Sequence, residues 1–183
     1  MVDTAVSLPI VLYNNPAYSG YPTPAAFMRK LRETIPNIFG AKLAKGTVEE
    51  AQIYLAALPA GFSLFVPIGN MVPGMLIGVR GTISPPGALL PHVGVELVRA
   101  IDAGDRPKAL ELQLRILDYL NAIRPLTKVY GRGVTQVGLK LHGIKVKQYP
   151  RWPVRPMPPE DQEKLRTALE AVGALRAGAL NMV

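Results

Sequence analysis

Short apolar runs alternate with amphipathic stretches over the first part of the chain. The apolar runs are rich in β-branched residues and short enough for strands, and they occupy residues 8–14, 38–44, 62–68 and 81–84. The intervening stretches carry apolar residues at helical spacing, and they occupy residues 23–35, 47–58, 70–79 and 89–105. Strands that alternate with helices form parallel sheets with right-handed crossovers. The pattern therefore predicts an α/β fold that begins with four parallel βα units.

From Arg106 onward the strand pattern disappears. The elements predicted here are helices over 107–123, 135–144 and 159–175 and an extended, proline-dense segment over 149–162. The first of these helices carries a row of leucines at helical spacing: Leu110, Leu114, Leu117 and Leu120. The last has acidic residues in its first turn, which complement the helix dipole. We therefore divide the chain into a βα region, residues 1–105, and a helical region, residues 106–183.

Two of the predicted helices begin with recognisable signals. In 47–58, Thr47 and Glu50 form a capping box, in which the threonine reaches forward and the glutamate side chain reaches back to the start of the helix. In 23–35, Thr23 is expected to be the N-cap and Pro24 the first helical residue.

Lys42 is unusual because it lies in an apolar strand. Side chains alternate between the faces of a strand, so one face of this strand holds Ile38, Gly40, Lys42 and Ala44 and the other holds Phe39, Ala41 and Leu43. The bulkier second set is expected to contact the helices, which leaves Lys42 on the interior face of a barrel. The same parity places Tyr13 beside Lys42, at the carboxyl end of the sheet, where (β/α) barrels carry their chemistry.

A buried lysine beside a tyrosine can perform covalent chemistry. Burial penalises the ammonium form and favours the neutral amine of Lys42, which can attack a carbonyl carbon and form a Schiff base. The Tyr13 hydroxyl could relay the protons that this reaction requires. The alternative is structural: Lys42 would mark the end of the strand and extend into solvent, and Tyr13 would only pack.

The composition limits the class of function. The chain has 183 residues, of which 49% are hydrophobic and 19% charged, as is usual for one globular domain with a substantial core. A net charge of +8 can attract anionic substrates or nucleic acid. No helix-turn-helix pattern, zinc spacing or aromatic RNA-binding motif accompanies the basic residues, so a nucleic-acid partner is not expected.

Metal and membrane sites are not expected either. The absence of cysteine excludes disulfides and thiolate ligands, and His92 and His142 lack carboxylates at metal-binding spacing. No apolar run reaches the roughly 20 residues that cross a bilayer, and the first residues lack the basic leader of a signal peptide. We therefore expect a cytoplasmic protein without a membrane partner.

Two motifs together resemble those of a known enzyme family. The segments "LPIVLYNNPAYSG" and "IFGAKLAKG" resemble the paired signatures of the dihydrodipicolinate synthase and N-acetylneuraminate lyase superfamily, the pyruvate-dependent class I aldolases. "GVRGTIS", "VGLKLHGI" and "VRPMPPEDQEKLRTALEAVG" resemble later landmarks of the family, so the resemblance extends from about Leu8 to Gly173. It implies a TIM-barrel type of fold and a lyase that acts on carbon–carbon or carbon–oxygen bonds without a cofactor.

The resemblance also implies roles for individual residues. Lys42 would form an imine with the ketone of pyruvate or of another 2-oxo acid, and Tyr13 would relay protons. The backbone of Ile83 would lie beside the bound keto acid. A family glycine that follows the third strand corresponds to Gly69, unless Pro67 replaces it.

Tyr18 departs from the family pattern. Dihydrodipicolinate synthases typically carry an arginine two residues after the motif's proline, where it holds the carboxylate of the aldehyde substrate. Tyr18 stands there in this chain, and a tyrosine cannot make the bidentate, charge-assisted contact of a guanidinium. The motif is closer to the sialic acid lyase and sugar-acid aldolase branches. The expected substrates are therefore a pyruvate-like 2-oxo acid and an aldehyde or sugar acid.

Length is the second departure. Family members are eight-stranded barrels with a helical extension, and this chain resembles the second half of the barrel, residues 1–105, followed by the extension, residues 106–183. The first half would hold a threonine motif for the keto acid's carboxylate and a relay tyrosine lent by a neighbouring subunit. Open strand edges favour pairing, so we expect a homo-oligomer or completion by another chain. The alternative is a truncated half-barrel without catalysis of its own, as an assembly partner or an inactive remnant.

Overall fold

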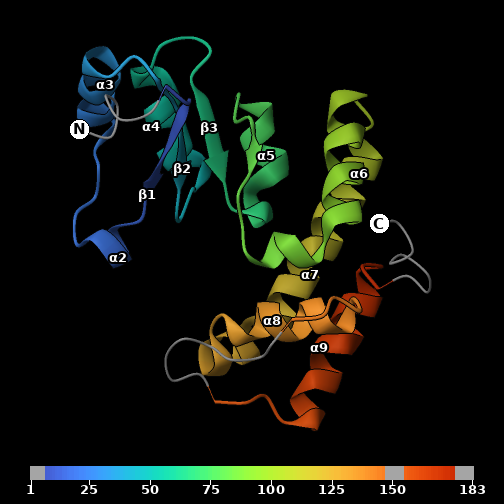
Figure 1. Cartoon of the computed structure of the whole chain (residues 1–183). Helices are drawn as coiled ribbons and strands as arrows, with labels where there is room; N and C mark the ends of the chain where they lie inside the picture. The colour runs from blue at the N-terminus through green and yellow to red at the C-terminus, as the bar shows by residue number, and fades with distance from the viewer. Residues whose placement is uncertain (1–6, 147–154, 176–183) are drawn as a thin grey trace. The chain divides into compact units, whose positions relative to one another are not determined.

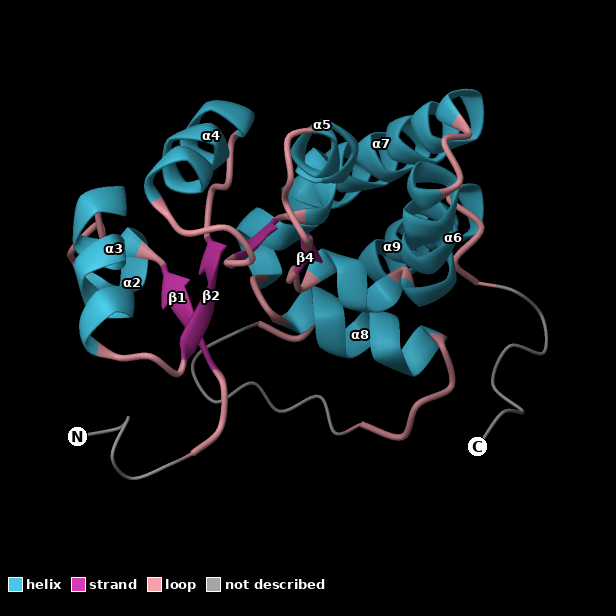
Figure 2. Cartoon of the chain, turned by 90° about the horizontal axis from the view of Figure 1, so that it is seen from above, coloured by secondary structure: helices cyan, strands magenta, loops and turns pink. Residues whose placement is uncertain are grey.

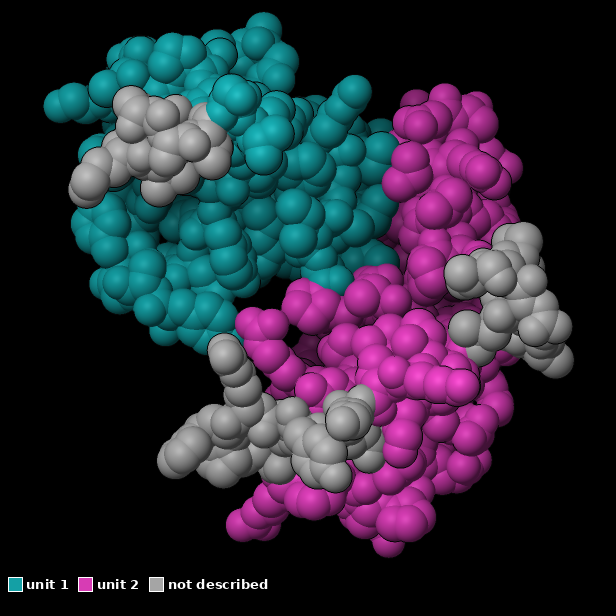
Figure 3. All heavy atoms as spheres, in the orientation of Figure 1, with its two compact units in different colours: residues 1–84 teal, residues 85–183 magenta. Residues whose placement is uncertain are grey.

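The computed structural model describes residues 7–146 and 155–175. The chain divides into two compact units, Met1–Ser84 and Pro85–Val183, which Figure 3 shows in different colours. The division at residue 105 that the sequence pattern indicates separates βα units from the helical extension, and it stays a prediction. No helix within the described ranges is long and apolar enough to span a membrane.

The first unit contains a parallel four-stranded sheet, as the alternating pattern predicts. Its strands are β1 (Ile10–Asn14), β2 (Ile38–Leu43), β3 (Ser63–Val66) and β4 (Gly81–Thr82). They lie in the order β1-β2-β3-β4, and each neighbouring pair is parallel. Figure 1 labels the first three of these strands. Parallel neighbours in sequence order require a crossover after every strand, so the carboxyl ends of all the strands lie at one edge.

Helices provide these crossovers (Figure 2). They are α2 (Pro16–Ser19), α3 (Ala25–Thr34), α4 (Val48–Ala57) and α5 (Met71–Leu76), with a 3-10 turn (Ile68–Asn70) before α5. The sequence pattern did not predict α2, which is a single turn. It starts with Pro16 at its first position and ends at Gly20, whose φ of 71° is left-handed.

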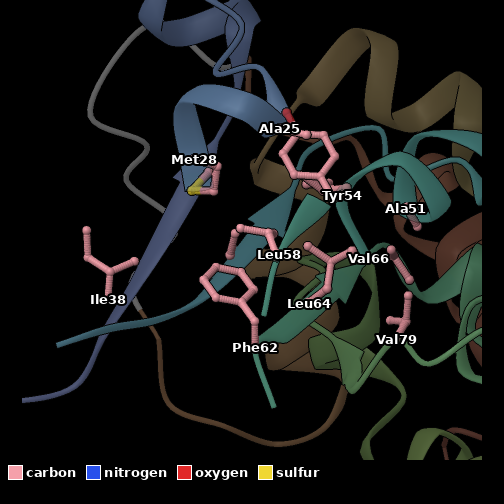
Figure 4. Close-up of a cluster of buried hydrophobic side chains, with 12 residues drawn as sticks. Ala25, Met28, Ile38, Ala51, Tyr54, Leu58, Phe62, Leu64, Val66 and Val79 are labelled. Atoms are coloured by element: carbon pink, nitrogen blue, oxygen red, sulfur yellow. The ribbon is translucent and has the colours of Figure 1, made fainter. Parts of the chain in front are cut away.

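A buried hydrophobic cluster joins the sheet to α3 and α4 (Figure 4). The cluster includes Met28 from α3 and Tyr54 from α4, and fully buried strand residues such as Leu43 and Leu64 lie against them. Burial of one such side chain stabilises a fold by roughly 1.5–3 kcal/mol. One face of the sheet therefore packs against the helices through this cluster, and the opposite face carries the remaining side chains.

The prediction for the two faces of β2 is wrong at its first two residues. Ile10 pairs with Ile38 but Val11 pairs with Gly40, so Phe39 is one extra residue on β2. Such a bulge reverses the side-chain alternation locally. As a result Ile38 belongs to the buried cluster with the helices, whereas Phe39 is exposed. From Gly40 onward the predicted alternation holds.

The helix starts differ in part from the predicted ones. The Thr47 hydroxyl accepts the backbone N–H of Glu50 at 3.2 Å, as the capping box requires, but the Glu50 carboxylate accepts the N–H of Gly46, one residue before the cap. Thr23 is not the N-cap of α3. That position is held by Pro24 without a side-chain cap, and the N–H of Thr23 donates to the Asn14 side chain at 3.1 Å.

The second unit is helical in its described residues. After a 3-10 turn (Pro86–Leu89), its helices are α6 (Pro91–Asp102), α7 (Arg106–Tyr130), α8 (Gly133–Leu141) and α9 (Pro159–Ala171). Part of the proline-dense segment 149–162 lies outside the described residues. Residues 155–158 are neither helical nor extended strand, and α9 begins with Glu160 and Asp161 in its first turn, as predicted.

Helix α7 is longer than predicted, and the row of leucines noted in the sequence is not its buried face. It continues through Pro125, although an internal proline costs about 3 kcal/mol, because Leu126 and Tyr130 beyond it are buried. Three leucines of this row, Leu110, Leu114 and Leu117, are exposed. A second apolar row, which includes Leu112 and Ile116, makes the buried face. Helical spacing identifies both rows but does not say which one packs.

Candidate active site

Lys42 lies over the ring of Tyr13. The two residues are register partners on β2 and β1, and the Lys42 nitrogen Nζ is 4.3 Å from the centroid of the Tyr13 ring. Lys42 is 7% exposed, whereas Tyr13 is 55% exposed. The predicted pairing of these side chains is therefore confirmed. The alternative in which Lys42 extends into solvent is wrong, because the strand directs the side chain over its neighbour instead.

The burial of Lys42 is not explained by stability. Within the described residues it has no ion pair with a carboxylate, and the tyrosine ring is the contact that its nitrogen makes. A cation–π contact contributes about 0.5–2 kcal/mol, whereas burial of an ion without a counter-ion costs several kcal/mol. The contact with the ring alone does not offset that cost, and Lys42 is therefore the candidate functional residue of this strand.

Gly40 allows β2 and β3 to lie close together next to Lys42. Gly40 precedes Lys42 on the same face, and a Cβ atom built there would lie 2.6 Å from the carbonyl oxygen of Ser63 on β3. Real Cβ atoms do not approach backbone oxygens so closely, so only glycine permits this strand spacing. Phe65 is the register partner of Lys42 on β3, and no sequence pattern marks it as a neighbour of the site.

The Tyr13 hydroxyl has a polar partner that the sequence pattern does not reveal. The Asn15 side-chain amide donates a hydrogen bond to the Tyr13 oxygen at 2.8 Å. Asn15 stands between the motif's asparagine and its proline, and no periodicity marks it. The phenol is thus fixed by Lys42 at its ring and by Asn15 at its oxygen.

Buried polar contacts hold the loop that follows β1. Asn14 donates to the Tyr54 hydroxyl at 2.9 Å and accepts the N–H of Thr23 at 3.1 Å, and the Tyr54 hydroxyl donates to the carbonyl of Thr23. Burial, and then the charge of Glu50, raises the pKa of Tyr54, so its hydroxyl keeps the proton that it donates. These bonds close the loop that carries Asn15 and α2.

Gly46 links the loops that follow β2 and β3. Its N–H donates to Glu50 at 3.0 Å and its carbonyl accepts from the side chain of Asn70 at 2.7 Å. Its φ of +53° is left-handed, and a Cβ atom there would lie 2.6 Å from Cδ of Pro67. The chain beyond Lys42 is therefore held closely against the end of β3.

The other predicted site residues follow the carboxyl ends of the strands. Tyr18 lies on α2 after β1 and is 73% exposed. Gly69 lies in the 3-10 turn after β3, two residues beyond Pro67. Ile83 follows β4, is 47% exposed and donates its N–H to the carbonyl of Val66 at 3.3 Å. They share the edge of the sheet that Lys42 approaches, and their roles in binding stay predictions.

The described part of the chain contains no group of three or more histidine, cysteine, aspartate or glutamate residues that could hold a metal ion. The Nε2 atom of His142 lies 3.0 Å from the carbonyl oxygen of Leu89, so this histidine has a structural contact. His92 is exposed.

Comparison with known protein families identifies relatives over nearly the whole chain. The family model described as the dihydrodipicolinate synthetase family matches residues 2–172. Proteins named 4-hydroxy-tetrahydrodipicolinate synthase are 35% identical over 179 residues in Corynebacterium aurimucosum and 30% identical over 178 residues in Albidiferax ferrireducens. Each match covers 95% of this chain but only 56% and 57% of the respective relative. The chain thus spans little more than half the length of these curated relatives.

Solved structures give the same result for the fold. Dihydrodipicolinate synthase from Aquifex aeolicus superimposes with a TM-score of 0.81 at 25% identity, over 94% of this chain and 58% of that protein. YagE from E. coli, a member of the dihydrodipicolinic acid synthase family solved with pyruvate, gives a TM-score of 0.83 at 24% identity over the same shares. At 24% identity, the similarity to YagE concerns the fold alone.

Proposed function

Because the chain belongs to the dihydrodipicolinate synthetase family, we propose that it is an aldolase-type lyase or synthase that binds a 2-oxo acid as an imine of Lys42. The observation that carries the proposal is the buried Lys42, which has no carboxylate partner in the described residues and lies over the ring of Tyr13. The substrate would be pyruvate or a related 2-oxo acid, as membership of this family and the resemblance of its motifs to those of pyruvate-dependent class I aldolases imply.

The proposed first step forms one bond and moves one proton. The neutral amine of Lys42 attacks the ketone carbon, the carbonyl electron pair moves to oxygen, and Tyr13 supplies the proton that makes this oxygen a hydroxyl. The Tyr13 phenolate then takes a proton from the amine nitrogen and passes it to the hydroxyl, which leaves as water. In condensation, the carbon next to the imine loses a proton, and the enamine so formed adds to an aldehyde. In cleavage, the carbon–carbon bond breaks and the aldehyde leaves, and the enamine that remains on Lys42 is protonated and hydrolysed to release the 2-oxo acid.

The second substrate is proposed to be an aldehyde or a sugar acid. Tyr18 occupies the position that holds an arginine in the dihydrodipicolinate synthase pattern, and its ring is exposed at the carboxyl edge of the sheet. A phenol can donate to or accept from a substrate hydroxyl but brings no charge to a carboxylate. This position therefore favours a hydroxylated partner over a dicarboxylate.

We further propose that the four βα units correspond to the second half of an eight-stranded barrel, with residues 1–105 in the barrel and 106–183 in its extension. Among the described strands, β1 and β4 each have one hydrogen-bonded neighbour. Such edges favour pairing with further strands, and a second copy or another chain would supply them. In the alternative proposal the half-barrel has no catalysis of its own and acts as an assembly partner or an inactive remnant.

Reductive trapping tests the function directly. The protein is incubated with pyruvate and borohydride, and its intact mass is measured. We expect a stable adduct that Lys42→Ala abolishes and that Lys45→Ala, a change at an exposed neighbouring lysine, leaves unaffected. An unmodified mass, under conditions that label a full-length relative, would instead favour the alternative without catalysis.

A further inference from the structure

Asn15 uses its side chain in an unusual way for its position. It is the N-cap of α2, where an asparagine side chain ordinarily accepts an N–H of the first helical turn, yet it makes no such bond. The backbone carbonyl of Asn15 accepts the N–H groups of the first helical turn instead, from Tyr18 and from Ser19 at 3.0 Å each. The side-chain amide is thereby free to donate to the Tyr13 oxygen at 2.8 Å.

We propose that Asn15 is a positioning residue that orients the Tyr13 hydroxyl for proton transfer at Lys42; this inference rests on the proposed imine chemistry. A phenol oxygen that accepts an amide N–H keeps its own O–H proton for another acceptor. In the proposed reaction that acceptor is the oxygen of the substrate ketone. Asn15 thus leaves the transferable proton of Tyr13 available on the side away from the amide.

The amide also acts on the charge that develops during the transfer. When Tyr13 gives up its proton, negative charge accumulates on the phenol oxygen, and a fixed N–H donor stabilises that charge. The donor is fixed because the backbone of Asn15 is held by α2 and the loop beyond it is closed by Asn14 and Thr23. Tyr13 is 55% exposed, so packing alone does not hold its hydroxyl, and the bond from Asn15 supplies the missing constraint.

The test is a double-mutant cycle on the rate of reductive trapping by pyruvate. Asn15→Asp keeps the shape of the side chain but replaces the amide donor by an acceptor. Asn15→Leu leaves neither a donor nor an acceptor in the side chain. Because this hydrogen bond is made to a group that develops charge, we expect either change to slow the limiting trapping rate by roughly ten- to a hundredfold. The pyruvate concentration at half-maximal rate should not change, because Asn15 acts on the proton and not on the keto acid.

The Tyr13→Phe background separates positioning from a general structural role. If Asn15 acts through the hydroxyl, both Asn15 changes are without further effect once the hydroxyl is gone. Equal slowing by the Asn15 changes in the Tyr13 and Phe backgrounds would overturn the proposal, as would an unchanged rate in the Tyr13 background.

A second measurement is independent of activity. In protein labelled with ¹³C at tyrosine Cζ, the signal of Tyr13 is identified by its loss in Tyr13→Phe, and Asn15→Leu should shift that signal more than those of other tyrosines. An unshifted signal would refute the contact even in a protein that traps pyruvate. If the unaltered protein traps no pyruvate, the proposed function fails and the positioning role with it, whereas a shifted signal would still verify the hydrogen bond.

Discussion

The side-chain amide of Asn14 donates to the hydroxyl of Tyr54 at 2.9 Å, deep between β1 and α4. Both residues are buried, with 4% and 6% of their surfaces exposed. Asn14 directly follows Tyr13 in β1, and successive side chains of a strand point to opposite faces. Tyr13 and Asn14 therefore serve the two faces of the sheet: the Tyr13 ring lies beside Lys42 on one face, and Asn14 anchors the strand to the helix layer on the other.

This anchor is expected to contribute measurably to stability. Tyr54→Phe removes the hydroxyl that accepts from Asn14 and donates to Thr23, and a buried polar group left without its partner costs about 1–3 kcal/mol. Tyr21→Phe is the matched control, because Tyr21 is 55% exposed and its edge-on contact with Phe27 needs only the ring. It should change the free energy of unfolding by less than about 0.5 kcal/mol. Equal urea midpoints for the two variants would contradict this prediction.

The central pair of the site could be predicted from the sequence because it depends on local rules. Alternation along a strand and parallel pairing of neighbouring strands suffice to bring Tyr13 beside Lys42, and both rules hold from Gly40 onward. The order of the sheet follows in the same way from four apolar runs separated by helices.

The remaining features depend on choices that periodicity does not encode. The extra residue at Phe39 leaves no mark in the hydrophobic pattern, yet it moves Ile38 to the helix side. Helix α7 carries two apolar rows, and tertiary packing decides between them. The bond of Asn15 to Tyr13 could not be predicted either, because an asparagine at a helix start normally caps its own helix.

Loss of the Tyr13 hydroxyl should slow imine formation without preventing it. Tyr13→Phe keeps the ring on which the Lys42 nitrogen lies at 4.3 Å but removes the proton relay. Positioned acid–base groups typically contribute a factor of about 10²–10⁴, so the rate of borohydride trapping with pyruvate should fall by that order while the adduct still forms on Lys42. A rate equal to that of the unaltered protein would exclude Tyr13 as the relay.

Gly46 is expected to tolerate substitution less well than another glycine of positive φ in the same unit. Alanine at Gly46 combines left-handed strain of about 1–2 kcal/mol with overpacking of about 1–3 kcal/mol, because its Cβ atom would meet Pro67 at 2.6 Å. Gly61 has a φ of +85° and nothing within 4 Å of the added atom, so Gly61→Ala should cost the strain alone.

Urea unfolding of the two variants measures this difference. If Gly46→Ala costs no more than Gly61→Ala, the contact with Pro67 is relieved by a small shift of the loop. In that case the loops after β2 and β3 are not held together as closely as the bonds of Gly46 to Glu50 and Asn70 indicate.

In the second unit, Asp161 should make stability depend on pH in the acid range. Hydrogen bonds from Lys164 at 2.7 Å and from the Tyr130 hydroxyl at 2.6 Å lower the pKa of Asp161 from its ordinary value of 3.8. A lowered carboxyl pKa stabilises the folded state above the unfolded-state pKa, and this contribution is lost as the pH falls through the lower folded-state value. Asp161→Asn should therefore reduce the thermal midpoint, followed by circular dichroism, near pH 7, and the difference from the unaltered protein should shrink as the pH is lowered below about 4.

Glu163→Gln is the control variant, because it disrupts an exposed pair with Arg166 at 3.3 Å, and it should have little effect on the thermal midpoint at either pH. If the difference in midpoint between Asp161→Asn and the unaltered protein stays constant down to pH about 2, the carboxylate does not carry the stabilisation.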